Sequence, residues 1–179
     1  MKRPIINVDD AECHPRPKEF APKGDAAKAF EVRTAHLSRL LGAEKLGYNI
    51  SSVPPGKAAY PFHSHRVNEE MFFVLAGSGE IRIGDATHPL REGDVVACPA
   101  GGPETAHQIR NNGDADLRYL AVSTQQSPEI CDYPDSGKFG VYALGSAKED
   151  KNPKYFYFMG REGMALDYWD EEGSGRDDE

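Results

Sequence analysis

The middle of the chain, residues 46–124, is a series of short β-prone segments separated by glycine and proline turns, and this pattern constrains the fold most strongly. The segment Leu46–Val53 alternates apolar with small or polar residues and stops at Pro54-Pro55-Gly56. Met71–Ala76 is apolar on both faces, as expected of a strand inside a closed sheet. Strands spaced by about eight to twelve residues, with glycine turns between them, are typical of an all-β sandwich or barrel. The other β-prone segments of this region are Glu80–Ile83, Val95–Cys98, His107–Arg110 and Leu117–Ser123.

The region before this series, residues 1–45, has the composition of an arm that packs on the barrel or on a partner. It is rich in proline, lysine and aspartate, and its closely spaced prolines prevent a long helix. Thr34 is placed to cap one short helix, which Gly42 would end.

The region after it, residues 125–179, is expected to form a C-terminal extension. Asp132–Lys138 has the composition of a loop, which either folds over the mouth of the barrel or merely turns the chain. Lys154–Met159 is strongly β-prone, and its aromatic residues are expected to cover a sheet edge or a partner subunit. From Asp167 to Glu179 there are seven acids and one base, and the stretch after Trp169 is expected to be disordered. No internal repeat is visible, which favours a single barrel.

Charge and cysteine content exclude several classes of function. A net charge of −8 offers no basic surface for phosphate groups, so no nucleic-acid partner is expected. The three cysteines are widely spaced and odd in number, which favours a reducing compartment over a disulfide framework. No stretch suits a signal peptide or a membrane span, so we expect a cytoplasmic protein without a membrane partner.

Two histidines one residue apart, His63 and His65, begin the feature with the most chemical content. On a strand their side chains project to the same face, because side chains alternate with a period of two. A carboxylate follows five residues after His65, at Glu70, and a third imidazole, His107, comes forty-two residues after His65. Three imidazoles and one carboxylate suit a single divalent transition metal such as Zn, Fe, Mn, Ni or Cu.

The interval between His65 and Glu70 decides which carboxylate faces the histidines. A continuous strand would put Glu70 on the opposite face, so residues 66–69 are predicted to form a turn or bulge that resets the register. The next strand can then begin at Glu70, with Phe72 and Val74 on the same side. Glu69 is the competing ligand, and it would point away if Glu70 points in.

These residues resemble the two sequence motifs of the cupin superfamily. The first motif is glycine, a short spacer, His-x-His, three or four residues, glutamate, six residues and glycine, which selects Glu70 over Glu69. The second is glycine, five residues, Pro-x-Gly, a spacer, histidine, three residues and asparagine. The spacers before His63 and before His107 are longer than usual, by one and by three residues. The matching residues are Gly56, His63, His65, Glu70 and Gly77 for the first motif, and Gly93, Pro99, Gly101, His107 and Asn111 for the second.

The resemblance, which covers residues 46–124, implies an all-β double-stranded β-helix, or jelly-roll, barrel with an N-terminal arm and a C-terminal extension. It also implies that His63, His65, Glu70 and His107 gather around one metal inside this barrel. Four protein ligands leave one or two positions open on a five- or six-coordinate ion, which is typical of a catalytic rather than a structural site.

Two classes of function fit these expectations. The first is a small metalloenzyme that acts on an oxygen-bearing molecule, either as an isomerase of a sugar or sugar phosphate or as a dioxygenase. The second is a non-catalytic module that binds or senses a small ligand through the metal. Glu104, Gln108 and Tyr60 adjoin the ligands in sequence and are candidate catalytic residues, although a solvent-facing or structural role suits each of them equally. A homodimer is also expected, because the arm and the late aromatic strand need a surface to bury against.

Overall fold

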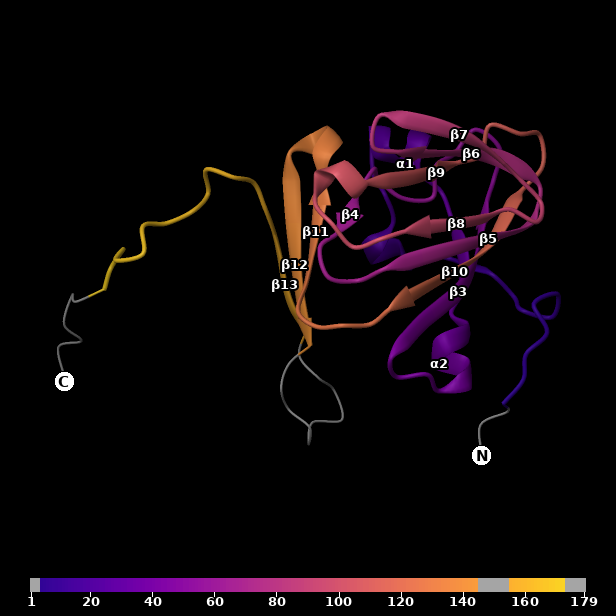
Figure 1. Cartoon of the computed structure of the whole chain (residues 1–179), viewed down its shortest axis with the longest axis horizontal. Helices are drawn as coiled ribbons and strands as arrows, with labels where there is room; N and C mark the ends of the chain where they lie inside the picture. The colour runs from indigo at the N-terminus through magenta and orange to yellow at the C-terminus, as the bar shows by residue number, and fades with distance from the viewer. Residues whose placement is uncertain (1–3, 145–154, 173–179) are drawn as a thin grey trace.

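Three antiparallel sheets form the protein, whose computed structural model describes residues 4–144 and 155–172 (Figure 1). One sheet has six strands, in the order β1 (His14–Pro15), β2 (Arg33–Ala35), β3 (Leu46–Val53), β10 (Leu117–Thr124), β5 (Glu70–Ala76) and β8 (Val95–Cys98). A second has three, in the order β7 (Ala86–Arg91), β6 (Ser78–Ile83) and β9 (His107–Arg110). A third has four, in the order β13 (Tyr155–Gly160), β12 (Lys138–Leu144), β11 (Glu129–Tyr133) and β4 (Ser64–His65). The prediction of an all-β jelly roll is confirmed.

The central strands occur where the apolar patterns predict them. β3 spans the predicted segment from end to end, and β5, β6, β8, β9 and β10 begin or end within two residues of their predicted bounds. The apolar core lies between the six-stranded and three-stranded sheets, and β5 contributes Phe72 and Val74 to it. Ile81 of β6 and Tyr119 of β10 pack in the same cluster and are almost completely buried. This burial of apolar surface supplies the main driving force for the fold.

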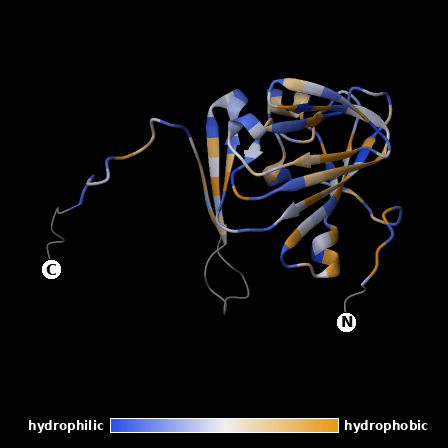
Figure 2. Ribbon diagram, in the orientation of Figure 1, coloured by the Kyte–Doolittle hydropathy of each residue, from blue (hydrophilic) through white to orange (hydrophobic). Residues whose placement is uncertain are grey.

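The N-terminal region packs against the outer face of the six-stranded sheet. Ile6 and Val8 contact a small cluster centred on Ile50 of β3, and Figure 2 shows hydrophobic residues in this segment. The short helix α2 (Leu37–Leu41) ends at Gly42 in the left-handed conformation, as predicted. The predicted cap is wrong: His36 precedes the helix, and Thr34 lies in β2, where pairing with β3 takes priority over helix capping. The remaining helical elements are α1 (Asp25–Ala29), η1 (Lys18–Phe20), η2 (Pro103–Thr105) and η3 (Pro134–Ser136).

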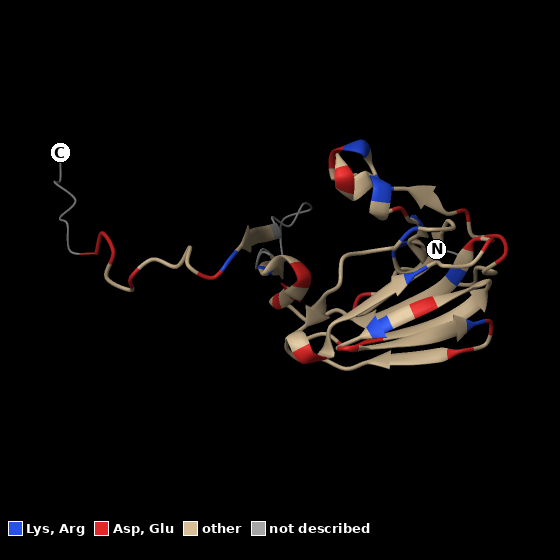
Figure 3. Cartoon of the chain, turned by 90° about the horizontal axis from the view of Figure 1, so that it is seen from above, with Lys and Arg blue, Asp and Glu red and all other residues tan. Residues whose placement is uncertain are grey.

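The C-terminal region differs most from the sequence prediction. The loop predicted at 132–138 contains only the 3-10 turn η3, because β11 runs to Tyr133 and β12 begins at Lys138. η3 turns the chain back between two paired strands. The late aromatic strand is present as β13, with Lys154 outside the described residues. Beyond it, acidic residues recur along the described part of the tail to residue 172 (Figure 3), and residues 173–179 lie outside the description.

No helix among the described residues is long and apolar enough to cross a membrane.

Candidate metal centre

The structure brings His63, His65, Glu70 and His107 together at the junction of the three sheets. His65 belongs to β4, Glu70 is the first residue of β5, and His107 is the first residue of β9. His63 precedes β4 and pairs with His107 through two backbone hydrogen bonds, with N···O distances of 3.1 and 2.8 Å. The ring centroid of His63 lies 5.0 Å from that of His65 and 4.8 Å from that of His107.

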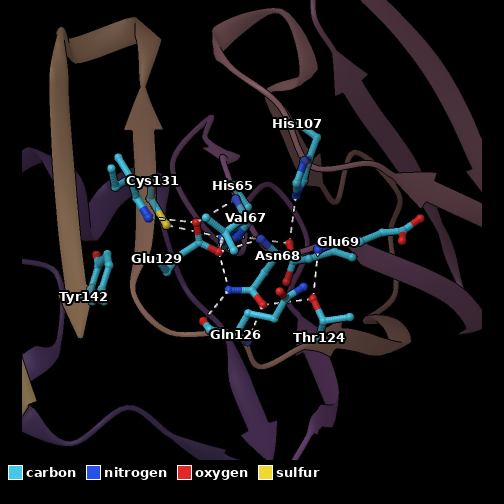
Figure 4. A network of polar contacts seen from close by, with 12 residues as sticks. His65, Val67, Asn68, Glu69, His107, Thr124, Gln126, Glu129, Cys131 and Tyr142 are labelled. Carbon is cyan, nitrogen blue, oxygen red and sulfur yellow. Dashed lines mark hydrogen bonds and ion pairs between the residues drawn. The ribbon is translucent and has the colours of Figure 1, made fainter. Parts of the chain in front are cut away.

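The interval between His65 and Glu70 resets the register as predicted. Residues 66 and 67 form a bend, and β5 begins at Glu70. Glu70 then lies on the same side of β5 as the buried Phe72 and Val74. Glu69 is exposed, and its side chain points away from the histidines (Figure 4).

One carboxylate oxygen of Glu70 contacts two of the imidazoles. Oε2 of Glu70 lies 3.0 Å from Nε2 of His107 and 3.3 Å from Nε2 of His65. Ligand atoms bound at right angles to one ion, with bonds of about 2.1 Å, lie about 3.0 Å apart. His63, Glu70 and His107 also offer one ligand atom each within 4.8 Å of one another. The spacing and the chemistry of these donors fit a transition metal.

Hydrogen bonding fixes the orientation of the His63 ring. Its Nδ1 lies 2.8 Å from the carbonyl oxygen of Pro61, and because a carbonyl only accepts, Nδ1 carries the proton. The lone pair is therefore on Nε2, as a metal ligand requires. Nδ1 of His107 is buried and has no hydrogen-bond partner among the described residues.

The electrostatics of the metal-free site centre on His65 and Glu70. Burial alone would raise the pKa of Glu70, but hydrogen bonds from His107 and His65 outweigh it and hold that pKa well below its usual range. Burial would likewise lower the pKa of His65, but hydrogen bonds with Cys131 and Glu70 raise it to about 10. Burial and the neighbouring His107 and His65 lower the pKa of His63 to about 4. At neutral pH the site thus holds the ion pair of Glu70 with His65, and His63 is neutral.

Two residues of β11 complete the surroundings of His65, and the sequence patterns did not indicate either. Sγ of Cys131 lies 3.3 Å and Oε2 of Glu129 lies 3.5 Å from Nδ1 of His65. Both residues are buried, and they lie beside His65 because β11 pairs with β4 and Cys131 is opposite His65 in that pairing. They lie outside both motifs, so only their residue types, a cysteine and an acid two residues apart, offered a signal.

A cavity of about 410 Å³ opens beside these candidate ligands. His63, His65 and Glu70 line one side, and polar groups from Thr124 to Ser127 line another. Tyr133 and Tyr142 also line it, with their hydroxyl oxygens 3.0 Å apart. The cavity can hold a small molecule that reaches the ligands and meets hydroxyl and amide groups.

The three candidate catalytic residues do not line this cavity, although the ring centroid of Tyr60 lies 6.3 Å from that of His63. Glu104 is exposed on η2, where its carboxylate accepts a hydrogen bond from the backbone N–H of Gly102. Gln108 uses its side-chain amide to hydrogen-bond the carbonyl oxygen of Tyr60 at 2.8 Å. The ring of Tyr60 lies under the guanidinium of Arg16, in a second cavity formed largely by the N-terminal region. None of the three is among the residues that line the cavity beside His63.

Comparisons with known proteins agree with this architecture. The family model described as the cupin domain matches residues 49–123. The chain is 32% identical over 101 residues to the oxalate-binding protein of Thermotoga maritima, a match that covers 51% of this chain and 74% of that protein. It is also 32% identical over 90 residues to protein SchB of Streptomyces halstedii, covering 50% of this chain but only 62% of SchB.

Among solved structures, the chain resembles a sugar phosphate isomerase from a cupin superfamily of Silicibacter pomeroyi, with a TM-score of 0.72. The alignment covers 93% of this chain and 98% of that one, at 23% sequence identity. At this identity the likeness establishes the fold and nothing further.

Proposed function

Since this chain belongs to the cupin superfamily, we propose that it is a metal-dependent enzyme for a small oxygen-bearing substrate, with one divalent transition metal held by His63, His65, Glu70 and His107. The observation that carries the proposal is the position of Glu70 Oε2, which lies 3.0 and 3.3 Å from two imidazole nitrogens. Zn, Fe, Mn and Ni all suit this donor set.

The bound metal would act as a Lewis acid on an oxygen of the substrate, or as an oxygen-binding centre if it is iron. The chain's own contribution is to hold and orient that substrate in the cavity. Burial and the hydrogen bond with Tyr142 raise the pKa of Tyr133 above its usual range, so its hydroxyl stays a proton donor at neutral pH. The Tyr133 ring also lies nearly parallel to that of His63, with centroids 6.1 Å apart. A substrate in the cavity would therefore lie beside the paired hydroxyl groups of Tyr133 and Tyr142.

Two reactions stay in view, isomerisation of a sugar or sugar phosphate and dioxygenation of a chelating organic acid or catechol-like compound. Glu104, Gln108 and Tyr60 stay predictions as catalytic residues. None of them lines the cavity, although the ring centroid of Tyr60 lies 6.3 Å from that of His63. Tyr133 and Tyr142 are better placed to contact a substrate. The described carboxylates of the cavity, Glu70 and Glu129, are both already engaged by other groups.

A second candidate function is binding of a small carboxylic acid without turnover. It is favoured by the relative whose name is oxalate-binding protein, of which the match covers 74%. A carboxylate chelate could occupy the open positions of the same metal, and the neighbouring amides and hydroxyls would hydrogen-bond it.

Metal analysis and oxygen uptake test these alternatives. Protein isolated from its own host is analysed for bound metals, and oxygen consumption is then measured with candidate organic acids. Iron with oxygen uptake supports dioxygenation, whereas zinc or manganese without uptake supports isomerisation or binding. The double variant His63→Ala with His65→Ala should lose the metal and keep the fold, because the apolar core lies elsewhere. Unchanged metal content in that variant would contradict the ligand assignment.

We also propose that the protein is a cytoplasmic homodimer. Cys13, Cys98 and Cys131 are all free thiols, which suits a reducing compartment. The exposed Phe156 and Tyr157 of β13 offer apolar surface that a second copy could cover.

A further inference from the structure

The turn between His65 and Glu70 is held entirely by residues that come much later in the chain. The backbone N–H of Arg66 donates to the carbonyl oxygen of Ile130 at 2.9 Å, and that of Glu69 donates to Oγ1 of Thr124 at 3.1 Å. The two N–H groups between them both donate to one side chain. Each backbone N–H of residues 66–69 thus has a partner on β10 or β11.

That side chain is the carboxylate of Glu129. Its Oε1 accepts from the backbone N–H of Val67 at 3.1 Å, and its Oε2 accepts from that of Asn68 at 2.9 Å (Figure 4). Oε1 also accepts from the N–H of Ile130 at 2.8 Å. Glu129 is buried, with a relative exposure of 7%, and its carboxylate is the acceptor that the structure gives these donors.

Asn68 ties the same turn to β10 and to the segment after it. This buried side chain accepts hydrogen bonds from Oγ1 of Thr124 at 2.9 Å and from the backbone N–H of Gln126 at 2.7 Å. Its amide nitrogen donates to the carbonyl oxygen of Gln126 at 3.1 Å and to Oε2 of Glu129. The turn is therefore fixed by a network that is satisfied on both sides.

Glu129 also faces a metal ligand directly. Its Oε2 lies 3.5 Å from Nδ1 of His65, and Sγ of Cys131 lies 3.3 Å from the same nitrogen. The opposite ring nitrogen, Nε2, is the one that points at Glu70. A carboxylate behind an imidazole in this way sets the orientation of the ring and which nitrogen carries the proton.

From these contacts we propose that Glu129 is the positioning residue of the metal centre. It fixes the turn that directs Glu70 toward the histidines, and it orients the ring of His65. The proposal rests on the metal site proposed above and adds a residue that belongs to neither sequence motif.

A conservative substitution separates charge and acceptor capacity from side-chain size. In Glu129→Gln one carboxylate oxygen becomes an NH₂ group, which donates and cannot accept. One of the N–H groups of Val67 and Asn68 would then face another donor, and the turn would shift. Loss of an outer partner of a metal ligand typically reduces metal affinity by about 10- to 100-fold.

Asp132→Asn is the matched control. Asp132 is also an acid of β11 with a poorly exposed side chain, and its carboxylate binds the guanidinium of Arg66 at 2.8 and 3.1 Å. Asp132 contacts only the side chain of Arg66 in the turn, whereas Glu129 contacts the backbone of the turn and the ring of His65. A loss of stability alone would affect both variants.

The experiment measures Zn²⁺ affinity by competition with a chromophoric chelator, thermal unfolding without metal, and hydrogen exchange of individual backbone amides. In Glu129→Gln we expect the Zn²⁺ affinity to fall by about 10- to 100-fold. Relative to the native protein, the amides of Val67 and Asn68 should exchange faster by a larger factor than the amides of β3 and β10. In Asp132→Asn we expect affinity within about twofold of the native value. If Glu129→Gln does not fold, Glu129→Asp serves, because the shorter carboxylate keeps the charge and reaches fewer of these partners.

Three outcomes would overturn the proposal. The first is equal metal affinity in the native protein and the Glu129 variant, and the second is equal loss in both variants. The third is that the native protein binds two Zn²⁺ ions and the variant Cys131→Ser binds only one. His65, Glu129 and Cys131 would then form a second metal site. If the native protein binds no divalent metal, the proposed function fails, and the amide exchange rates alone decide whether Glu129 fixes the turn.

Discussion

A proton and an incoming metal ion compete for Nε2 of His65, the ring nitrogen that faces Oε2 of Glu70. Without metal this oxygen pairs with His65, whose pKa is raised to about 10. His63 has a pKa lowered to about 4 and is already neutral at physiological pH. Metal ligands must be deprotonated, so binding has to release the proton of His65.

This competition makes metal affinity depend on pH. Below the pKa of His65, each metal ion is expected to release the proton of that ring, and this one proton alone makes the Kd fall about tenfold for each unit of rising pH. Above the pKa of His65 the dependence should level off, because no proton is left to displace. Titration calorimetry in buffers of different ionisation enthalpy counts the protons. A Kd that is constant from pH 6 to pH 8 would contradict the assignment of His65 as a ligand.

At the scale of strands and turns, the sequence predicts the elements that obey the ordinary alternation of apolar residues. β3 is predicted in place because apolar residues alternate in it with small or polar ones, and β5 because it is apolar on both faces, with Phe72 and Val74 buried. β11 is not predicted from the sequence because it buries polar residues and exposes an apolar one. Its acids Glu129 and Asp132 are buried while Ile130 is 36% exposed. An element that breaks the local rule in this way is one whose inward residues serve a site rather than the core.

The turn glycines of the motif can also be predicted from the sequence, because each adopts a positive φ that glycine tolerates best. Gly77 joins β5 to β6 with a φ of +82°, and a Cβ there would lie 2.5 Å from the carbonyl oxygen of Asp116. Gly93 has a similar φ of +89°, but a Cβ there would meet nothing within 4 Å. Gly77 is therefore required both for its backbone conformation and for the close approach of Asp116. Gly93 is required for its backbone conformation alone.

Alanine substitution at the two glycines separates these effects. Gly93→Ala should cost about 1–2 kcal/mol from backbone strain. Gly77→Ala should cost about 1–3 kcal/mol more, because the strand β10 has to move away from the added methyl group. Urea unfolding of both variants measures the difference. Equal free energies of unfolding would show that the backbone of Asp116 yields without cost.

At the scale of the whole molecule, β12 and β13 form a hairpin at one end of the four-stranded sheet (Figure 1). Phe156 and Tyr157 are each 59% exposed, and β13 is an edge strand of its sheet among the described residues. Val95 is a comparable exposed residue, 67% accessible, on β8 at the edge of the six-stranded sheet. The two edges offer alternative surfaces for association.

The proposed homodimer is expected to use the edge formed by β13. Phe156→Ser with Tyr157→Ser should shift the protein from dimer to monomer in sedimentation equilibrium, because it removes apolar surface from that edge. Val95→Ser should leave the association unchanged, and metal content should stay the same in both variants. A native protein that sediments as a monomer at high concentration would contradict the dimer, and dissociation by Val95→Ser alone would move the interface to β8.

The proposed metal site lies where all three sheets meet, whereas the apolar core joins only two of them. His65 lies in the four-stranded sheet, Glu70 in the six-stranded sheet and His107 in the three-stranded sheet, so one ion would link all three. The core cluster lies between two of these sheets and does not depend on the ion, so the metal-free protein should remain folded.

At a free metal concentration of 100 times Kd, binding adds about 2.7 kcal/mol to the free energy of unfolding. For a chain of this length that corresponds to a rise in Tm of about 5–10 °C. Calorimetry with and without a chelator measures the shift, and the double variant His63→Ala with His65→Ala should show none. A shift of the same size in that variant would mean that the ion stabilises the protein from another site.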